Sequence, residues 1–317
     1  MPRAIVVIPT IRKEYITEFL QAWEKEFSAN DVGVIVVEDN PRRSFEIARH
    51  GVTHYSWEDI DNELKKDAWI IPRRTDCIRS YGYWKAFEQS PDFIITLDDD
   101  CLPCDEDFVQ THRHRLDYGA EDAWTPTGRG ARPRGIPYYS TERRLECVLN
   151  HGLWKNVPDY DAVTQLMSSR VELSFEPVDQ TIPIGRYFPM CGMNLAFKPK
   201  LVPALYFLLM GKDYEYDRMG DIWAGIIVKK ICDHLGYAVN SGKPLVDHRR
   251  ASNVWNNLVK EAPGMAVNDS LWQRVDSVVL TGTNVKECYV EISEKLCMKG
   301  EYWDRLRLAM KTWSDLF

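Results

Sequence analysis

Three short runs of apolar, β-branched residues constrain the fold of this chain more than any other feature. Residues 4–9 read AIVVIP, 32–37 read VGVIVV and 93–97 read FIITL. Such continuous runs are typical of strands that are covered on both faces. Apolar and aromatic residues recur at helical spacing in 14–27 and again in 75–88. This order predicts an α/β fold with a parallel sheet, whose ligands gather at the carboxyl ends of the strands.

The rest of the chain is less regular. Residues 120–144 are rich in Gly, Pro and Arg, which predicts a mobile loop or lid. Turn formers and aromatics fill 148–165, and 188–197 (FPMCGMNLAF) is expected to form strand, turn and strand. An amphipathic helix is predicted over 221–235, and one or two helices over 284–317.

We expect a single domain over residues 1–317. Its nucleotide-binding half is expected in 1–119, its sugar and acceptor half in 120–283, and its C-terminal helices in 284–317.

Composition excludes several classes of protein. The net charge is −7 and no basic stripe is present, which argues against a nucleic-acid partner. No run of about 18 apolar residues occurs, so a membrane span is not expected. The N-terminus lacks the pattern of a signal peptide, and we therefore expect a cytoplasmic protein.

The strongest local signal is the triplet Asp98, Asp99 and Asp100, directly after the third strand-like run. Adjacent carboxylates repel one another unless a cation or an arginine neutralises them. Mn²⁺ or Mg²⁺ takes oxygen ligands and leaves positions for substrate phosphates. The alternative is a solvated turn or a helix N-terminus. His248, which follows a strand-like segment, is either a further metal ligand or a structural histidine.

Two other positions have open interpretations. Arg79 lies with Arg73, Arg74 and Asp76 at the start of the helix predicted over 75–88. These arginines either hold ribose and phosphate or form a salt-bridged surface. Asp221, at the start of a later helix, is either an N-terminal cap or a group that holds a sugar hydroxyl or acts as a base.

Beyond these features, a series of motifs covers most of the chain, from about residue 4 to residue 313. They occur in the order 8–12 (IPTIR), 93–101 (FIITLDDDC), 151–154 (HGLW), 156–161 (NVPDYD), 164–166 (TQL), 188–197 (FPMCGMNLAF), 221–225 (DIWAG), 231–235 (ICDHL) and His248. Together they closely resemble the reversibly glycosylated polypeptides, the UDP-arabinopyranose mutases best known from plants.

The resemblance implies an A-type glycosyltransferase fold, in which a Rossmann-like nucleotide-binding half contains a mixed central sheet flanked by helices. It implies a UDP-sugar substrate, Mn²⁺ or Mg²⁺ dependence, and interconversion of UDP-L-arabinopyranose and UDP-L-arabinofuranose. It also implies self-glycosylation on an arginine, which matches Arg134, and a second functional arginine, matched by Arg143 or Arg144. Gly220 stands where the family has the first of two aspartates, and Asp221 matches the second.

On this basis we assign expected roles along the chain. The nucleotide is expected on Thr10, Arg12, Asp39 and Arg79. The cation is expected on Asp98, Asp100 and His248, with Asp99 facing the ribose or supporting its neighbours. The sugar pocket is expected to contain His151, Trp154, Cys191, Gly192, Asn194 and Asp221.

Two alternatives remain open from the sequence. One is a metal-dependent glycosyltransferase or autoglycosylating protein that uses UDP-glucose or another nucleotide-sugar without mutase activity. The other is a non-catalytic nucleotide-sugar-binding subunit, which the glycine at position 220 keeps in consideration. Either a homo- or a hetero-oligomer is compatible with the sequence.

Overall fold

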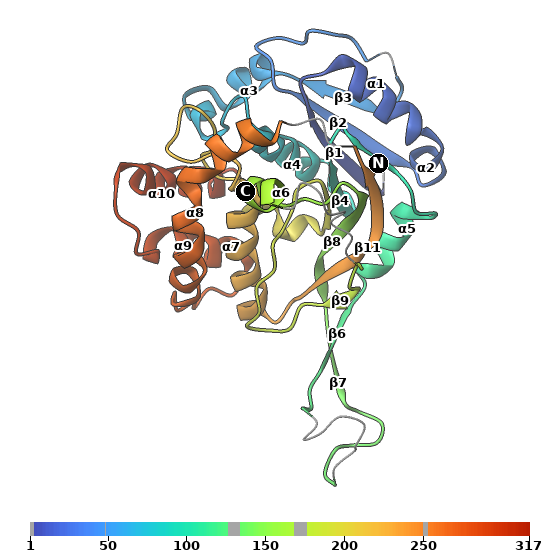
Figure 1. Ribbon diagram of the computed structural model, residues 1–317, viewed down its shortest axis with the longest axis vertical. Helices are drawn as coiled ribbons and strands as arrows, with labels where there is room; N and C mark the ends of the chain where they lie inside the picture. The colour runs from blue at the N-terminus through green and yellow to red at the C-terminus, as the bar shows by residue number, and fades with distance from the viewer. Residues whose placement is uncertain (1–2, 48, 126–133, 168–175, 250–252) are drawn as a thin grey trace.

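A mixed β-sheet runs through the computed structural model, which describes residues 3–47, 49–125, 134–167, 176–249 and 253–317 (Figure 1). The strand order in the sheet is β3-β2-β1-β4-β10-β8-β11-β5, and β9 also pairs with β11. The strands are β1 (Ala4–Thr10), β2 (Val32–Glu38), β3 (Val52–Tyr55), β4 (Phe93–Leu97), β5 (Cys101–Pro103), β8 (Cys147–Asn156), β9 (Gln180–Thr181), β10 (Asn194–Phe197) and β11 (Ala238–His248).

The direction of the strands decides where their ends meet. β3, β2, β1 and β4 are parallel, β10 is antiparallel to both β4 and β8, and β11 is parallel to β8. The carboxyl ends of β1, β2, β4, β8 and β11 therefore lie at one edge of the sheet, which is where such sheets place ligands.

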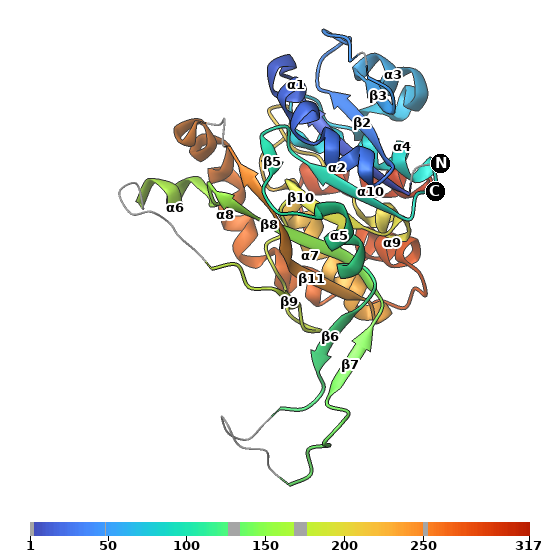
Figure 2. The same cartoon turned by 90° about the vertical axis from the view of Figure 1, so that its right-hand side faces the viewer.

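Helices cover both faces of the sheet, as the apolar runs require (Figure 2). They are α1 (Lys13–Ala22), α2 (Glu24–Ala29), α3 (Trp57–Leu64), α4 (Arg79–Glu88), α5 (Phe108–Arg115), α6 (Ala162–Met167), α7 (Gly220–Leu235), α8 (Val254–Asp276), α9 (Val285–Lys295) and α10 (Glu301–Ser314), with 3₁₀ turns η1 (Lys65–Ile70), η2 (Asp76–Ile78) and η3 (Pro199–Ala204).

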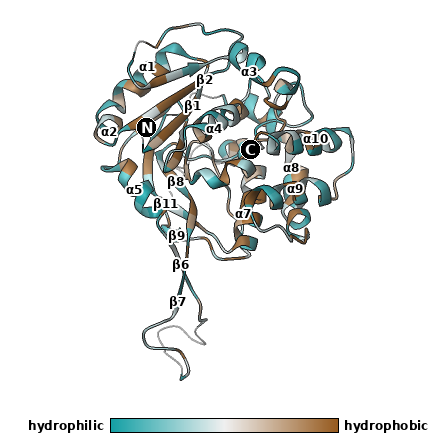
Figure 3. Ribbon diagram, turned by 180° about the vertical axis from the view of Figure 1, so that it is seen from behind, coloured by the Kyte–Doolittle hydropathy of each residue, from teal (hydrophilic) through white to brown (hydrophobic). Residues whose placement is uncertain are grey.

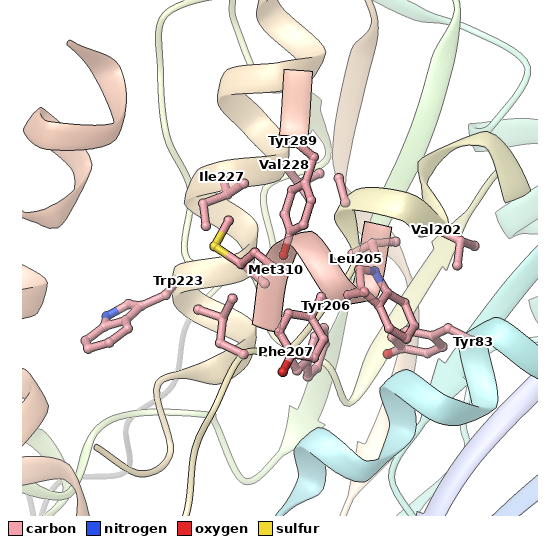
Figure 4. Close-up of a cluster of buried hydrophobic side chains, with 14 of the residues drawn as sticks. Tyr83, Val202, Leu205, Tyr206, Phe207, Trp223, Ile227, Val228, Tyr289 and Met310 are labelled. Carbon is pink, nitrogen blue, oxygen red and sulfur yellow. The ribbon is translucent and has the colours of Figure 1, made fainter. Parts of the chain in front are cut away.

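Alternate residues of β1 enter two separate cores. Val6 and Ile8 pack with α1, α2 and α5, whereas Ile5 and Val7 pack with α4 and the C-terminal helices. Figure 3 shows the apolar colouring of these central strands. Figure 4 shows part of the second core, where Phe207 lies among aromatic and aliphatic side chains from several elements.

The α/β expectation is confirmed, and the architecture agrees with the A-type glycosyltransferase fold that the resemblance implies. All three strand-like runs are strands, and the helices predicted over 221–235 and 284–317 are present as α7, α9 and α10.

Other expectations need correction. The helical pattern of 14–27 is divided into α1 and α2 at Trp23. In 188–197 only β10 is a strand. The segment 148–165, in which turn formers and aromatics predicted no regular element, begins with most of β8, a strand of ten residues.

A narrow hairpin arm projects from the body (Figures 1 and 2). Its strands are β6 (Gly119–Asp122) and β7 (Glu142–Leu145), which pair antiparallel. The loop predicted over 120–144 is thus partly a β-hairpin, and its residues 126–133 lie outside the described part of the chain. Within the described residues, no helix combines the length and the apolarity needed to cross a bilayer.

Candidate active site

The acidic triplet lies where β4 ends, beside the carboxyl end of β1. Asp99 is buried and points into the protein, where Thr10 Oγ1 donates a hydrogen bond of 2.6 Å to Asp99 Oδ2. Arg12 forms an ion pair with the other oxygen of the same carboxylate. Asp99 therefore ties the loop after β1 to the loop after β4, and Thr10 and Arg12 are held by this contact.

Asp98 is paired with a buried arginine. Arg79, only 1% exposed, forms an ion pair with Asp98 through Nη2. Its Nη1 donates to Thr96 Oγ1 at 3.0 Å and to the carbonyl oxygen of Gly192. Because a buried charge is costly unless it is paired and hydrogen-bonded, this network fixes the position of Arg79. Arg79 therefore does not belong to a salt-bridged surface, and its contact with ribose or phosphate stays a prediction.

Asp100 faces His248, which ends β11. His248 Nδ1 donates a hydrogen bond of 2.6 Å to the carbonyl oxygen of Val157, so Nε2 is the ring nitrogen left for a ligand. That Nε2 lies 4.0 Å from Asp100 Oδ1. Metal-binding histidines have this arrangement, in which the other ring nitrogen donates to a carbonyl or carboxylate.

The electrostatics around Asp100 also favour a cation. Burial and the neighbouring Asp98 raise the pKa of Asp100 to about 6. A divalent ion would relieve this repulsion. However, no group of three or more His, Cys, Asp or Glu side chains in the described residues is arranged to hold a metal. The side chains fit a site in which Asp100 and His248 supply two ligands and phosphate oxygens and water supply the others.

Asp39 lies at the end of β2 and is 7% exposed. Its Oδ1 accepts hydrogen bonds from Trp57 Nε1 at 2.7 Å and from the backbone N–H of Arg74 at 2.9 Å. Burial raises the pKa of Asp39. The sheet thus brings Asp39 to the same edge as Thr10 and Asp98, as predicted.

The segment 190–193 forms a second wall of the site. The side chains of His151, Asp221 and Arg79 hold its backbone in place. The backbone N–H of Cys191 donates to His151 Nε2 at 3.2 Å, and that of Gly192 donates to Asp221 Oδ2 at 3.0 Å. Arg79 binds the carbonyl oxygen of Gly192. A Cβ at position 192 would lie 2.8 Å from the Phe207 ring and 3.1 Å from Arg79 Nη1, so only glycine fits there.

Asp221, in the first turn of α7, has an unusual environment. Burial together with the carboxylates of Asp76 and Asp159 raises the pKa of Asp221 to about 7. Asp221 does not cap α7, whose N-cap residue is Met219, and its carboxylate instead accepts a hydrogen bond from the backbone N–H of Gly192. Position 220 has no space for a side chain, because a Cβ there would lie 2.4 Å from the Phe207 carbonyl oxygen and 2.7 Å from Cys77 Sγ. This accounts for Gly220 in place of an acidic residue.

Sequence reasoning gave no role to Asp76 or Asp159 in this pocket. Both influence Asp221 electrostatically, and Arg218 is close enough to both to be affected by them. Asp159 belongs to one of the motifs that carry the family resemblance, and Asp76 lies next to the arginines at the start of the α4 region. These two positions in the sequence are what could have indicated a functional role for Asp76 and Asp159.

Two residues expected in the sugar pocket are largely enclosed. Asn194 is 0% exposed, and its Nδ2 donates to the carbonyl oxygens of Leu153 and Pro244, both at 2.9 Å. Its Oδ1 lies 3.0 Å from His112 Nε2, so the amide joins β8, β10 and β11. Trp154 is 8% exposed and its ring lies edge-on to His151. Asn194 thus stabilises the sheet under the site and is not at the pocket surface.

The predicted functional arginines of the arm are not brought to this site. Arg134 is exposed and lies in the segment that joins β6 to β7. Arg143 is exposed on β7 and forms an ion pair of 3.2 Å with Glu121 of β6.

The sequence of this chain is similar to those of known proteins over nearly its whole length. Residues 3–317 match the model of the family described as reversibly glycosylated polypeptide. A Solanum tuberosum protein named probable UDP-arabinopyranose mutase 2 is 36% identical over 98% of this chain and 88% of its own length. Arabidopsis thaliana UDP-arabinopyranose mutase 1 is 35% identical over 98% of this chain and 90% of its own. Among solved structures, a mycobacterial protein matches 95% of this chain and 76% of its own with a TM-score of 0.45 and 13% identity.

Proposed function

The chain belongs to the reversibly glycosylated polypeptide family, and on that premise we propose that it interconverts UDP-L-arabinopyranose and UDP-L-arabinofuranose and glycosylates itself on Arg134. The observation that carries the proposal is the placement of His248 Nε2 at 4.0 Å from Asp100 Oδ1, with the other ring nitrogen bonded to the carbonyl oxygen of Val157. It lies at the sheet edge where α/β folds bind ligands.

In this proposal the nucleotide lies over the ends of β1 and β2. Asp39 accepts hydrogen bonds from the base or ribose, while Thr10 and Arg12 shape the loop beneath it through Asp99. Mn²⁺ or Mg²⁺ on Asp100 and His248, with Asp98 close by, would neutralise the diphosphate and stabilise UDP as a leaving group.

The sugar lies against 190–193 and Asp221. His151 and Arg79 hold the backbone there, and the N–H of Gly192 holds the Asp221 carboxylate, so these groups are already oriented before the sugar arrives. Asp221 exchanges a proton with the sugar, because a carboxyl group with a pKa near 7 can both donate and accept at neutral pH. Its neighbours Asp76 and Asp159 hold sugar hydroxyls.

We also propose a cytoplasmic location.

The test is direct. The protein is incubated with UDP-arabinopyranose and Mn²⁺, and the furanose form is measured by chromatography. Asp100→Asn should abolish conversion without unfolding the protein. Asp269→Asn, an exposed carboxylate on α8, is the matched control and should convert at the wild-type rate. Full Mn²⁺-dependent conversion by Asp100→Asn would overturn the assignment.

A second function is favoured by one observation, the exposure of Arg134 on the arm, where a modification would meet no steric barrier. The chain would then transfer glucose or another sugar from its UDP donor to itself without ring interconversion. A panel of UDP-sugars distinguishes the two functions: labelling of the protein with no furanose product from any donor supports the second.

A further inference from the structure

The arm and the candidate active site lie at opposite ends of the same two strands. β8 and β11 run parallel, with Cys147 beside Ala238 at one end and Asn156 beside His248 at the other. β7 ends at Leu145, just before β8 begins. The arm therefore leaves the body at the end of these strands that is farthest from His248, and it continues away from the body (Figures 1 and 2).

The separation is large compared with the size of the site. A strand rises about 3.3 Å per residue, so the ten residues of β8 and the four of β7 span on the order of 45 Å. Arg134 lies eight residues before Glu142, the first residue of β7, in the segment that joins β6 to β7 beyond the paired strands of the arm.

The base of the arm is packed into the body, which opposes a backward swing. A Cβ at Gly119 would lie 2.4 Å from the Cβ of Ala238, so β6 contacts β11 without an intervening side chain. The backbone N–H of Ala120 donates to Thr181 Oγ1 at 3.0 Å. On the other strand, the N–H of Ala238 donates to the carbonyl oxygen of Glu146 at 2.8 Å. Bringing Arg134 to its own site would require these contacts to break.

We propose that Arg134 is glycosylated in trans, with the arm of one copy entering the donor site of a second copy of this chain. The inference rests on the proposed self-glycosylation. Charge complementarity supports a second copy as the partner. Residues 119–145 contain five arginines and three acidic residues, whereas the whole chain has a net charge of −7. The receiving site contains the neighbouring carboxylates of Asp76, Asp159 and Asp221.

The transfer is balanced. The bond between the anomeric carbon and the diphosphate oxygen breaks, and UDP leaves with the electron pair. The anomeric carbon forms a bond to a terminal nitrogen of Arg134, and the guanidinium releases one proton to water. The glycosylated guanidinium keeps its positive charge, and the reverse reaction regenerates the UDP-sugar.

The experiment uses two full-length variants with tags of different mass. Asp100→Asn retains the acceptor arm but lacks the donor site, and Arg134→Gln retains the donor site but lacks the acceptor. Each is incubated alone, and the co-expressed pair is incubated together, with Mn²⁺ and the radiolabelled UDP-sugar that labels wild type. Asp269→Asn alone is the control for tag and substitution effects and should label itself.

We expect no label on either variant alone, and label on the Asp100→Asn chain in the co-expressed pair. Unchanged thermal unfolding of both variants shows that the loss is not due to misfolding. Labelling of wild type without labelling of the co-expressed pair would overturn transfer in trans and leave self-glycosylation intact. If no UDP-sugar labels wild type, self-glycosylation itself fails, and this inference fails with it.

Discussion

Replacing Asp221 by asparagine should make the protein less stable than wild type at low pH and more stable at high pH. Burial and the carboxylates of Asp76 and Asp159 raise the pKa of Asp221 to about 7, whereas an unfolded aspartate has a pKa of about 3.9. The folded state therefore holds a proton that the unfolded state releases. The stabilisation is complete below a pH of about 4 and is lost as the pH rises to about 7.

The size of the effect follows from the same difference. About three pH units correspond to about 4 kcal/mol of unfolding free energy that wild type loses and the asparagine variant does not. Against this, asparagine has one acceptor oxygen, whereas Asp221 accepts from the N–H groups of Gly192 and Ile222. The lost hydrogen bond costs about 1–3 kcal/mol. We therefore expect a deficit of about that size at low pH and a net gain of about 1–3 kcal/mol near pH 8.

The assay is urea unfolding of the metal-free protein at several pH values between these limits, with Asp269→Asn as the control. The two stability curves should cross for Asp221→Asn and stay parallel for Asp269→Asn. Turnover of the UDP-sugar should fall for Asp221→Asn at every pH. Parallel curves for Asp221→Asn and wild type would refute the assigned pKa and, with it, the proposed role in proton exchange.

Three further substitutions have distinct expected outcomes. Gly192→Ala places a methyl group 2.8 Å from the Phe207 ring and 3.1 Å from Arg79 Nη1, so thermal unfolding should show a loss of about 1–3 kcal/mol; an unchanged melting temperature would contradict this. His248→Ala should raise the Mn²⁺ concentration for half-maximal turnover at least about tenfold in a metal titration, and an unchanged requirement would exclude His248 as a ligand. Thr10→Val removes the 2.6 Å hydrogen bond to buried Asp99 and should lower the urea unfolding free energy by about 1–3 kcal/mol, with the Mn²⁺ requirement unchanged.

Hydrophobic pattern was sufficient to predict the central parallel strands β1, β2 and β4. The β-branched runs of β1, β2 and β4 are buried on both faces, so their residues show no alternation and are easily recognised. The acidic triplet could be placed at the sheet edge because a strand run ends directly before Asp98.

β8 escaped prediction because it contains buried polar side chains. Asn150 bonds His112 and the Lys243 carbonyl oxygen, and His151 bonds Ser241. These partners are distant in sequence, so hydropathy along the chain gives no indication that the polar residues are satisfied inside a sheet.

The cluster of buried carboxylates around Asp221 escaped prediction for the same reason, because its members are distant in sequence. Asp76, Asp159 and Asp221 come from three separate segments, and their mutual influence depends on the folded chain. A side chain's function in such a pocket follows from tertiary proximity, which local pattern does not encode.

The buried guanidinium of Arg79 couples the evolution of the two sides of the active site. It binds Asp98, beside the expected cation, and the carbonyl oxygen of Gly192, beside the expected sugar. A substitution that moves Gly192 would also displace Asp98 through Arg79 and should weaken the proposed phosphate binding. Relatives that change donor should therefore diversify first around Asp159, which acts on Asp221 from a separate segment of the chain, and efforts to engineer a new donor preference should begin there.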